Sequence, residues 1–229
     1  MMRLRLSSIA RRGRRLLGFG LPPRHHNDYA THLPVLVGIG SVLPVKKVLE
    51  FGSGFHSTLT FLNRLAFPEL VLVESVESDV EWMSRISVAA KGDPRLRMRY
   101  VPEPIERVLS EIRLDCYDLV LVDSSTEACR RASLIEELGE RKDLRGIVAI
   151  HDFEIGLYRA AAKNFRNLVE YTAYNPCTGL LWQTEDKHAT TLKKMSKVID
   201  RSSKRLQPDD LQAWSEIFHP HRGLSASQP

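Results

Sequence analysis

Residues 48–62, VLEFGSGFHSTLTFL, hold the features that decide the fold of this 229-residue chain. The segment begins with apolar residues, turns on Gly52 and Gly54, and continues at Ser57 into a sequence typical of a helix start. Glycine can adopt positive φ and, having no side chain, lets backbone N–H groups approach a ligand closely. These N–H groups lie at the positive end of the following helix, where a carboxylate or phosphate is favoured. The segment therefore predicts the strand, turn and helix of a nucleotide-binding βαβ unit.

An apolar segment that ends in acidic residues follows the turn at residues 69–77. A carboxylate about 20 residues after a glycine turn is positioned to bind the ribose diol of a nucleotide. We expect Glu77 in this role, with Glu74 as the alternative if the strand has a different register. A further helix is expected to begin directly after Glu77.

Four segments of the chain, LEFGSGFHST, SVESDVEW, YDLVLVDSS and GIVAIHDF, resemble the class I S-adenosylmethionine (SAM)-dependent methyltransferases. The resemblance covers residues 29–184. Its first motif has the family's acidic-x-Gly-x-Gly pattern, although His56 stands where many members have a third glycine. The resemblance implies that SAM is the cofactor, bound by the following residues: Glu50, Gly52, Ser53, Gly54, Ser57, Thr58, Glu77, Glu103 and Asp123.

Strand and helix patterns alternate along the chain between residues 44 and 152, and a further helix and a hairpin follow. This alternation predicts an α/β fold with a doubly wound, mostly parallel sheet, to which a final hairpin adds one reversed strand. The resemblance implies a seven-stranded sheet in the order 3-2-1-4-5-7-6. The strands are expected at residues 45–50, 70–75, 96–101, 118–123, 146–150, 169–174 and 179–184. The helices are expected at residues 57–65, 81–90, 105–112, 128–141 and 157–165.

Asp123, His151 and Asp152 stand at the ends of two neighbouring expected strands, at the edge where open parallel sheets bind ligands. In one interpretation, His151 is the general base that takes a proton from the methyl acceptor. In another, Asp123 and Asp152 bind a divalent cation such as Mg²⁺, as in the metal-dependent O-methyltransferases that this pair resembles. Those enzymes usually have an amide or acid where this chain has Phe153, so we expect no metal. A third interpretation is that His151 and Asp152 only cap the next helix.

A short helix is also expected before the first strand, within residues 29–40. In the resembling family this region often covers the methionine end of SAM, and His32 could contribute there. A surface position or a helix-capping role for His32 is the alternative.

The regions on either side of the 29–184 domain differ from it in composition. Residues 1–27 contain seven arginines and no acidic residue, so 1–28 is expected to be a basic arm. The arm is either solvated, or a surface helix for an acidic partner or anionic membrane, or a transit peptide. Residues 185–229 predict a helical extension, with helices at 190–206 and near 209–219 and a disordered tail. This extension either packs on the domain, mediates a dimer contact or covers the substrate.

Overall composition is typical of a soluble globular protein, with 43% hydrophobic and 27% charged residues. No apolar run approaches the roughly 18 residues that a membrane span needs. The three cysteines have no metal-ligand spacing, which favours free thiols in a reducing compartment and a cytoplasmic location.

Methyl transfer from SAM to a small molecule, most simply at a hydroxyl group, is the predicted function. A nicotinamide-dependent oxidoreductase and a non-catalytic Rossmann-like binding protein are the alternatives. Ser57 occupies the third glycine position of the dinucleotide fingerprint, and Glu50 precedes the turn where dinucleotide folds usually stay apolar. Both features favour the methyltransferase over the oxidoreductase. The sequence does not identify the methyl acceptor.

Overall fold

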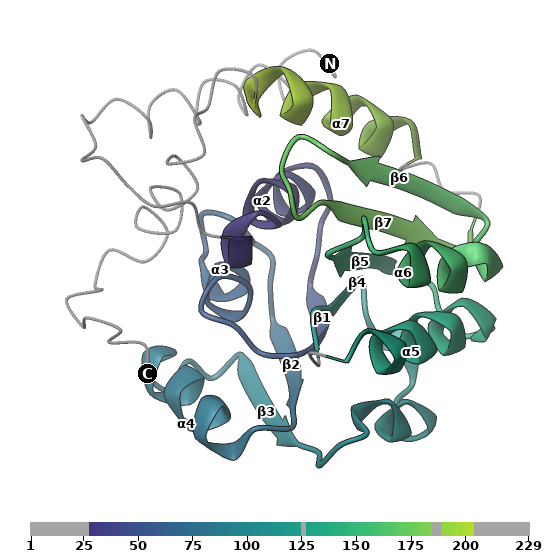
Figure 1. Cartoon of the computed structure of the whole chain (residues 1–229). Coiled ribbons are helices and arrows are strands. Elements are labelled where there is room, and N and C mark those ends of the chain that lie inside the picture. Colours follow the sequence, from purple (N-terminus) through teal and green to yellow (C-terminus); the bar gives the residue numbers. More distant parts are fainter. Residues whose placement is uncertain (1–27, 125–126, 185–188, 204–229) are drawn as a thin grey trace.

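A computed structural model describes residues 28–124, 127–184 and 189–203 of the chain. Within these ranges, seven strands form one sheet in the order β3-β2-β1-β4-β5-β7-β6 (Figure 1). Strands β1 to β5 pair in parallel, and β7 runs antiparallel to both of its neighbours. This topology confirms the expected doubly wound sheet of the Rossmann-like methyltransferase fold, including its strand order. The strands are β1 (Lys47–Phe51), β2 (Leu72–Glu77), β3 (Leu96–Tyr100), β4 (Leu119–Val122), β5 (Ile147–His151), β6 (Asn167–Tyr171) and β7 (Thr178–Trp182).

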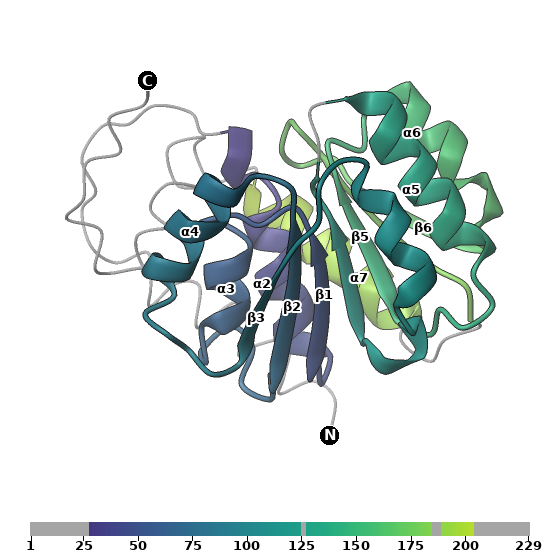
Figure 2. The same cartoon turned by 90° about the horizontal axis from the view of Figure 1, so that it is seen from below.

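Helices cover both faces of the sheet, as Figure 2 shows. One face carries α2 (Leu33–Val42), α3 (Thr58–Leu62), α4 (Val80–Ala89) and α7 (Ala189–Ser203). The other face carries α5 (Ala128–Glu140) and α6 (Gly156–Ala161). Four short 3₁₀ turns complete the described elements: η1 (Asp28–Ala30), η2 (Ile105–Glu111), η3 (Leu114–Cys116) and η4 (Ala162–Asn164).

Successive residues of each central strand pack into different layers of the core. On β1, Val48 belongs to the core under α2, α3 and α7, whereas Leu49 belongs to the core under α5 and α6. On β4, Leu119 and Val120 divide in the same way. Because both faces are covered by helices, such strands are apolar at every position instead of alternating with polar residues. This explains why the LVLV run of β4 is fully buried.

Strand β2 lies two residues later than its expected range of 70–75. The chain reaches the sheet with the N–H of Val71 bonded to the carbonyl of Lys46, and the ladder with β1 continues to the pair of Phe51 and Val76. Leu70 is buried, but it packs from the connecting turn and not from the strand. As a result, Glu77 is the last residue of β2 and lies at the carboxyl edge of the sheet.

Several helices are shorter or tighter than expected. α3 ends at Leu62 because Asn63 leaves the helical conformation and its side-chain oxygen accepts the N–H of Leu65. Residues 105–111 form a 3₁₀ helix in place of an α-helix, and the helix expected at 157–165 divides into α6 and η4. The two hairpin strands, β6 and β7, each begin and end earlier than predicted.

Helix α7 packs against α2 and β6, although α2 and α7 lie at opposite ends of the described chain (Figure 1). Its residues Leu192, Met195 and Ile199 share one face and are buried in the same core as α2. A methyl group on Gly38 of α2 would lie 2.8 Å from Met195 Sδ, so glycine permits this close approach. The part of the extension that is described therefore packs on the domain.

The remaining predictions for the chain ends lie outside the described residues. They concern almost all of the basic arm at 1–28, and the second helix and tail at 204–229. The domain boundaries accordingly stay a prediction. In the described ranges, no helix combines the length and the apolar composition needed to cross a membrane.

Candidate functional site

The glycine turn after β1 runs directly beside the end of β4. Gly52 has φ of +87°, and a Cβ atom there would lie 2.4 Å from the carbonyl oxygen of Asp123. A side chain is therefore excluded both by backbone conformation and by space. The turn is held to the sheet by a 2.9 Å hydrogen bond from the Gly52 N–H to the Val76 carbonyl.

Glu77 faces the glycine turn across the edge of the sheet. Its Oε2 accepts hydrogen bonds from the backbone N–H and the hydroxyl of Ser53, at 2.9 and 2.7 Å. Its Oε1 accepts the N–H groups of Ser78 and Asp79, at 2.8 and 3.0 Å. Trp82 Nε1 donates to the Ser53 carbonyl at 2.7 Å, a contact that sequence reasoning missed. The carboxylate expected to bind ribose is thus fixed next to the turn expected to bind the rest of the nucleotide.

Glu50 is buried beneath the same turn. Its Oε2 accepts hydrogen bonds from Thr58 Oγ1 at 2.6 Å and Ser75 Oγ at 2.7 Å, whereas its Oε1 is buried and lacks a partner among the described residues. Burial raises the pKa of Glu50 to about 7, against the opposing effect of the hydroxyl groups around its carboxylate. An acid with a free buried oxygen suits a nearby cationic ligand, because a positive charge stabilises the ionised form.

We expect the substitution Glu50→Gln to stabilise the chain above pH 7. The pKa of Glu50 is raised from 4.5 to about 7 on folding, so between these values the folded chain keeps a proton that the unfolded chain releases. The free energy of unfolding of the parent chain therefore falls as pH rises through this window, by roughly 3 kcal/mol in total. Urea denaturation of both proteins at several pH values should show that the free energy of unfolding falls less with rising pH in Glu50→Gln than in the parent chain.

Glu69→Gln is the matched control for this experiment, because Glu69 is exposed on the surface. The free energy of unfolding of this control should change with pH in the same way as that of the parent chain. An equal pH dependence in Glu50→Gln and the parent chain would contradict the assignment.

Glu103 lies on the same edge, close to Glu77, but in a more open position. Its Oε1 accepts the Ser78 hydroxyl at 3.0 Å, and its Oε2 pairs with Arg130 at 3.3 Å. The structure therefore brings Glu103 to the expected side of the site, next to the residue that follows Glu77.

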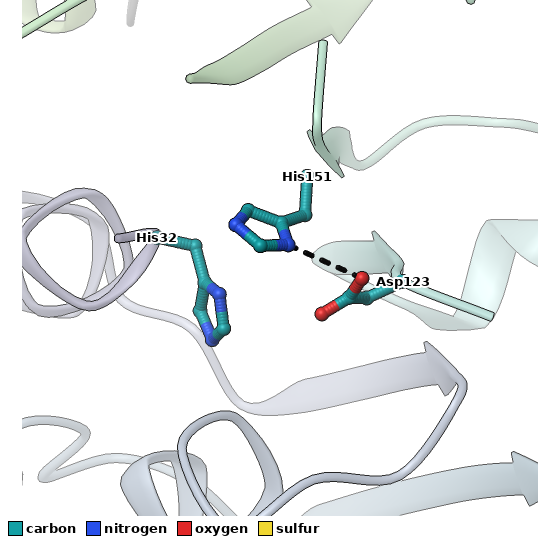
Figure 3. Close-up of side chains that lie close together, drawn as sticks. All are labelled: His32, Asp123 and His151. Atoms are coloured by element: carbon teal, nitrogen blue, oxygen red, sulfur yellow. Dashed lines mark hydrogen bonds and ion pairs between the residues drawn. The ribbon is translucent and has the colours of Figure 1, made fainter. Parts of the chain in front are cut away.

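Asp123 and His151 meet where β4 and β5 end (Figure 3). His151 Nδ1 lies 3.2 Å from Asp123 Oδ1, and His151 Nε2 lies 2.8 Å from Thr31 Oγ1. Burial acts to lower the pKa of His151, but the carboxylates of Asp123 and Asp152 together raise this pKa above its usual value. Burial also opposes ionisation of Asp123, yet its interactions with His151 lower the pKa of the carboxyl group overall.

Arg131, on α5, binds both carboxylates of the expected catalytic group. Its NH1 lies 2.7 Å from Asp152 Oδ2 and 3.4 Å from Asp123 Oδ1, and its Nε donates to the Ser124 carbonyl at 2.6 Å. The Arg131 side chain is only 7% exposed. The Arg131 guanidinium lies between the two carboxylates, at the place where a shared Mg²⁺ ion would bind. This pair therefore does not fit a Mg²⁺ site.

Sequence analysis missed Arg131, although a signal was present. Arg131 shares the buried face of α5 with Leu134, Ile135 and Leu138, which lie three, four and seven residues further along the helix. An arginine on an apolar helical stripe must find a buried anion.

The residues after β5 do not cap the following helix. The cap residue of α6 is Ile155, which makes no side-chain hydrogen bond to the helix, and Asp152 itself adopts φ of +57°. Phe153 is fully buried in the core beneath α5 and α6. The interpretation of His151 and Asp152 as helix caps is therefore wrong, since their side chains bind Asp123, Thr31 and Arg131.

His32 precedes α2 and lies against His151. The two rings are 4.7 Å apart and nearly perpendicular. His32 is 1% exposed, so it is not a surface residue, and its side chain does not cap α2. Burial lowers the pKa of His32 to about 3, which keeps the ring neutral. The segment before β1 thus contributes a buried side chain to this edge of the sheet.

No protein-family model matches the chain, and no curated protein matches its sequence. The chain is similar to solved structures at low identity. Spermidine synthase in complex with the transition-state analogue AdoDATO has 15% identity and a TM-score of 0.49, over 82% of this chain and 72% of that chain. An RNA methyltransferase from Salinibacter ruber in complex with S-adenosyl-L-homocysteine has 16% identity and a TM-score of 0.45, over 72% and 95%. The N-methyltransferase NodS from Bradyrhizobium japonicum has 14% identity and a TM-score of 0.45, over 67% and 92%.

Proposed function

We propose that this chain transfers a methyl group from SAM to a hydroxyl group of a small molecule. The observation that carries the proposal is that two separate groups of polar residues lie at one edge of the sheet. Ser53 and Glu77 form a nucleotide-binding turn, and the Asp123–His151 pair lies at the neighbouring strand ends. When bound, SAM supplies an electrophilic methyl group on its sulfonium centre.

The glycine turn and two carboxylates would bind the cofactor. Glu77 would accept the ribose hydroxyls, one of which would replace the Ser53 hydroxyl now bonded to Oε2. The unpartnered Oε1 of Glu50 would lie beneath the turn, where it favours a positively charged ligand. Gly52 keeps the backbone close enough for direct contact.

His151 would act on the methyl acceptor. A proton on Nδ1, donated to Asp123, leaves the lone pair of Nε2 for a hydroxyl group, and Thr31 now fills that position. An acceptor hydroxyl that replaces Thr31 would give its proton to Nε2 as it attacks the methyl group. Asp123 would fix the tautomer and stabilise the imidazolium ion that forms.

The proposal is tested first by binding and then by product analysis. Isothermal titration calorimetry should show that SAM and S-adenosylhomocysteine bind, whereas NAD should not. A screen of hydroxylated small molecules with SAM should give a product heavier by one methyl group, detected by mass spectrometry. Binding of NAD without SAM would overturn the proposal in favour of an oxidoreductase, and binding of neither would favour a non-catalytic protein.

Glu77→Ala is expected to weaken S-adenosylhomocysteine binding by about 1.5–3 kcal/mol, because hydrogen bonds to a charged carboxylate are lost. Calorimetry measures the change directly. Glu81→Ala, on the exposed side of α4, is the control and should bind as the parent chain does. If Glu74→Gln weakened binding and Glu77→Ala did not, the residue assigned to ribose would be wrong.

A further inference from the structure

We propose that His32, Asp123 and His151 form a binding site for one divalent transition-metal ion of the Zn²⁺ class. Each residue offers one ligand atom, and these atoms all lie within 4.8 Å of one another. The three side chains come from different elements, the start of α2 and the ends of β4 and β5, and lie close together (Figure 3).

The His32 side chain is available to bind a ligand. Both of its ring nitrogens are buried, and neither has a hydrogen-bond partner among the described residues. A buried polar group without a partner typically costs about 1–3 kcal/mol, so such groups are rare unless they serve a purpose. The His32 ring lies beside Asp123 and His151, and an ion bound by the three residues would satisfy one of its two nitrogens.

The donor set selects the kind of ion. Two imidazoles and one carboxylate suit Zn²⁺ and similar ions, whereas Mg²⁺ and Ca²⁺ prefer oxygen ligands alone. Three protein ligands also leave a fourth tetrahedral position for water or a substrate atom. The site shares Asp123 with the Asp123–Asp152 pair, but it takes its other two ligands from His32 and His151, whereas Arg131 lies closest to Asp152.

Two of the three ligand atoms already lie at the spacing that one ion requires. Donor atoms about 2.1 Å from a tetrahedral ion lie roughly 3.4 Å apart. His151 Nδ1 and Asp123 Oδ1 are already 3.2 Å apart, and the His32 side chain makes no hydrogen bond to the described residues that would have to break. With Nδ1 on the ion, His151 would donate its Nε2–H to Thr31 Oγ1, a contact that orients the ring.

This site has a consequence for the proposed methyl transfer, although ion binding itself does not depend on that function. An ion on Nδ1 keeps the proton on Nε2, so His151 could no longer accept a proton from the methyl acceptor. A bound ion should therefore inhibit the transferase. His151 can therefore act as the catalytic base or as a metal ligand, but not as both at once.

The test is a metal titration of the full-length chain after treatment with a chelator. Zn²⁺ binding is measured by calorimetry, and Co²⁺ is used as a spectroscopic probe because tetrahedral Co²⁺ gives strong visible absorption. His32→Ala should weaken the affinity of this site at least 10-fold and lose the tetrahedral Co²⁺ spectrum. His32→Gln, which preserves more of the side-chain volume, should do the same, and circular dichroism should confirm that both variants are folded.

His56→Ala is the matched control, because His56 is the one other histidine in the described ranges. Ions held by histidines outside those ranges would bind equally to every variant, so the difference at His32 isolates the site. Unchanged Zn²⁺ affinity and Co²⁺ spectrum in folded His32→Gln would overturn the proposal. A chain that binds the ion but transfers no methyl group even after chelator treatment would sink only the proposed function. Methyl transfer without His32-dependent ion binding would sink only the metal site.

Discussion

Chelator-treated His151→Ala is expected to transfer methyl groups ~10²–10⁴-fold more slowly than the parent chain, the usual contribution of a general base. S-adenosylhomocysteine affinity should not change, because the turn at Ser53 and the Glu77 carboxylate are bonded independently of His151. The chelator removes any ion at His32, so that loss of a base is not confused with loss of a metal ligand. Steady-state kinetics and calorimetry on the same preparation measure both quantities.

Thr31→Val provides a graded comparison for this experiment. It removes the hydroxyl that now bonds to His151 Nε2 but leaves the Asp123–His151 pair in place. Its turnover should therefore fall far less than that of His151→Ala. Full turnover in His151→Ala would mean that positioning alone carries the reaction and that the base is wrongly assigned.

Arg131→Met is expected to lower the free energy of unfolding by about 3 kcal/mol, at the lower end of the range for a broken buried ion pair. The substitution keeps most of the side-chain volume but leaves Asp123 and Asp152 without their shared cation. These carboxylates keep 22% and 25% of their side-chain surface exposed, so water offsets part of the loss. Urea denaturation at neutral pH gives the value.

Arg130→Met is the control in the adjacent position of the same helix. Arg130 is 34% exposed and pairs with Glu103 and Glu127 near the surface. Such pairs contribute about 0–1 kcal/mol, so this variant should stay close to the parent chain. Equal destabilisation by the two variants would show that Arg131 is not a specific partner of the catalytic edge.

The order of elements was predictable because the central strands are covered on both faces. Burial on both faces makes β4 apolar at every position, and such a run is easy to identify in a sequence. The neighbouring ends of β4 and β5 then placed Asp123 beside His151 before any side-chain position was known. The strand order came from the resemblance, since periodicity does not determine which strands are neighbours.

Other features depend on contacts that the local sequence does not encode. The start of β2 is set by its ladder with β1, and so the strand ends at Glu77 and not at Ser75. The apolar face of α5 indicates that Arg131 is buried but does not identify its partners, because Asp123 and Asp152 lie in other segments. The alternatives for His32 were a surface or capping position, since only the packing of α2 on the sheet buries it against His151.

The pairing of α2 with α7 bears on how the chain folds during synthesis. The helix that begins beside His32 is made early, but the residues that cover it, Leu192, Met195 and Ile199, are made last among the described elements. Contacts between such distant segments are slow to form, because a long loop must close before they add stability. Until α7 has been synthesised, the growing chain exposes the apolar surface of α2 that α7 later covers. Exposed apolar surface of this kind is what chaperones bind. The core that includes α2 is therefore complete only after α7, the last of the described elements, has been synthesised.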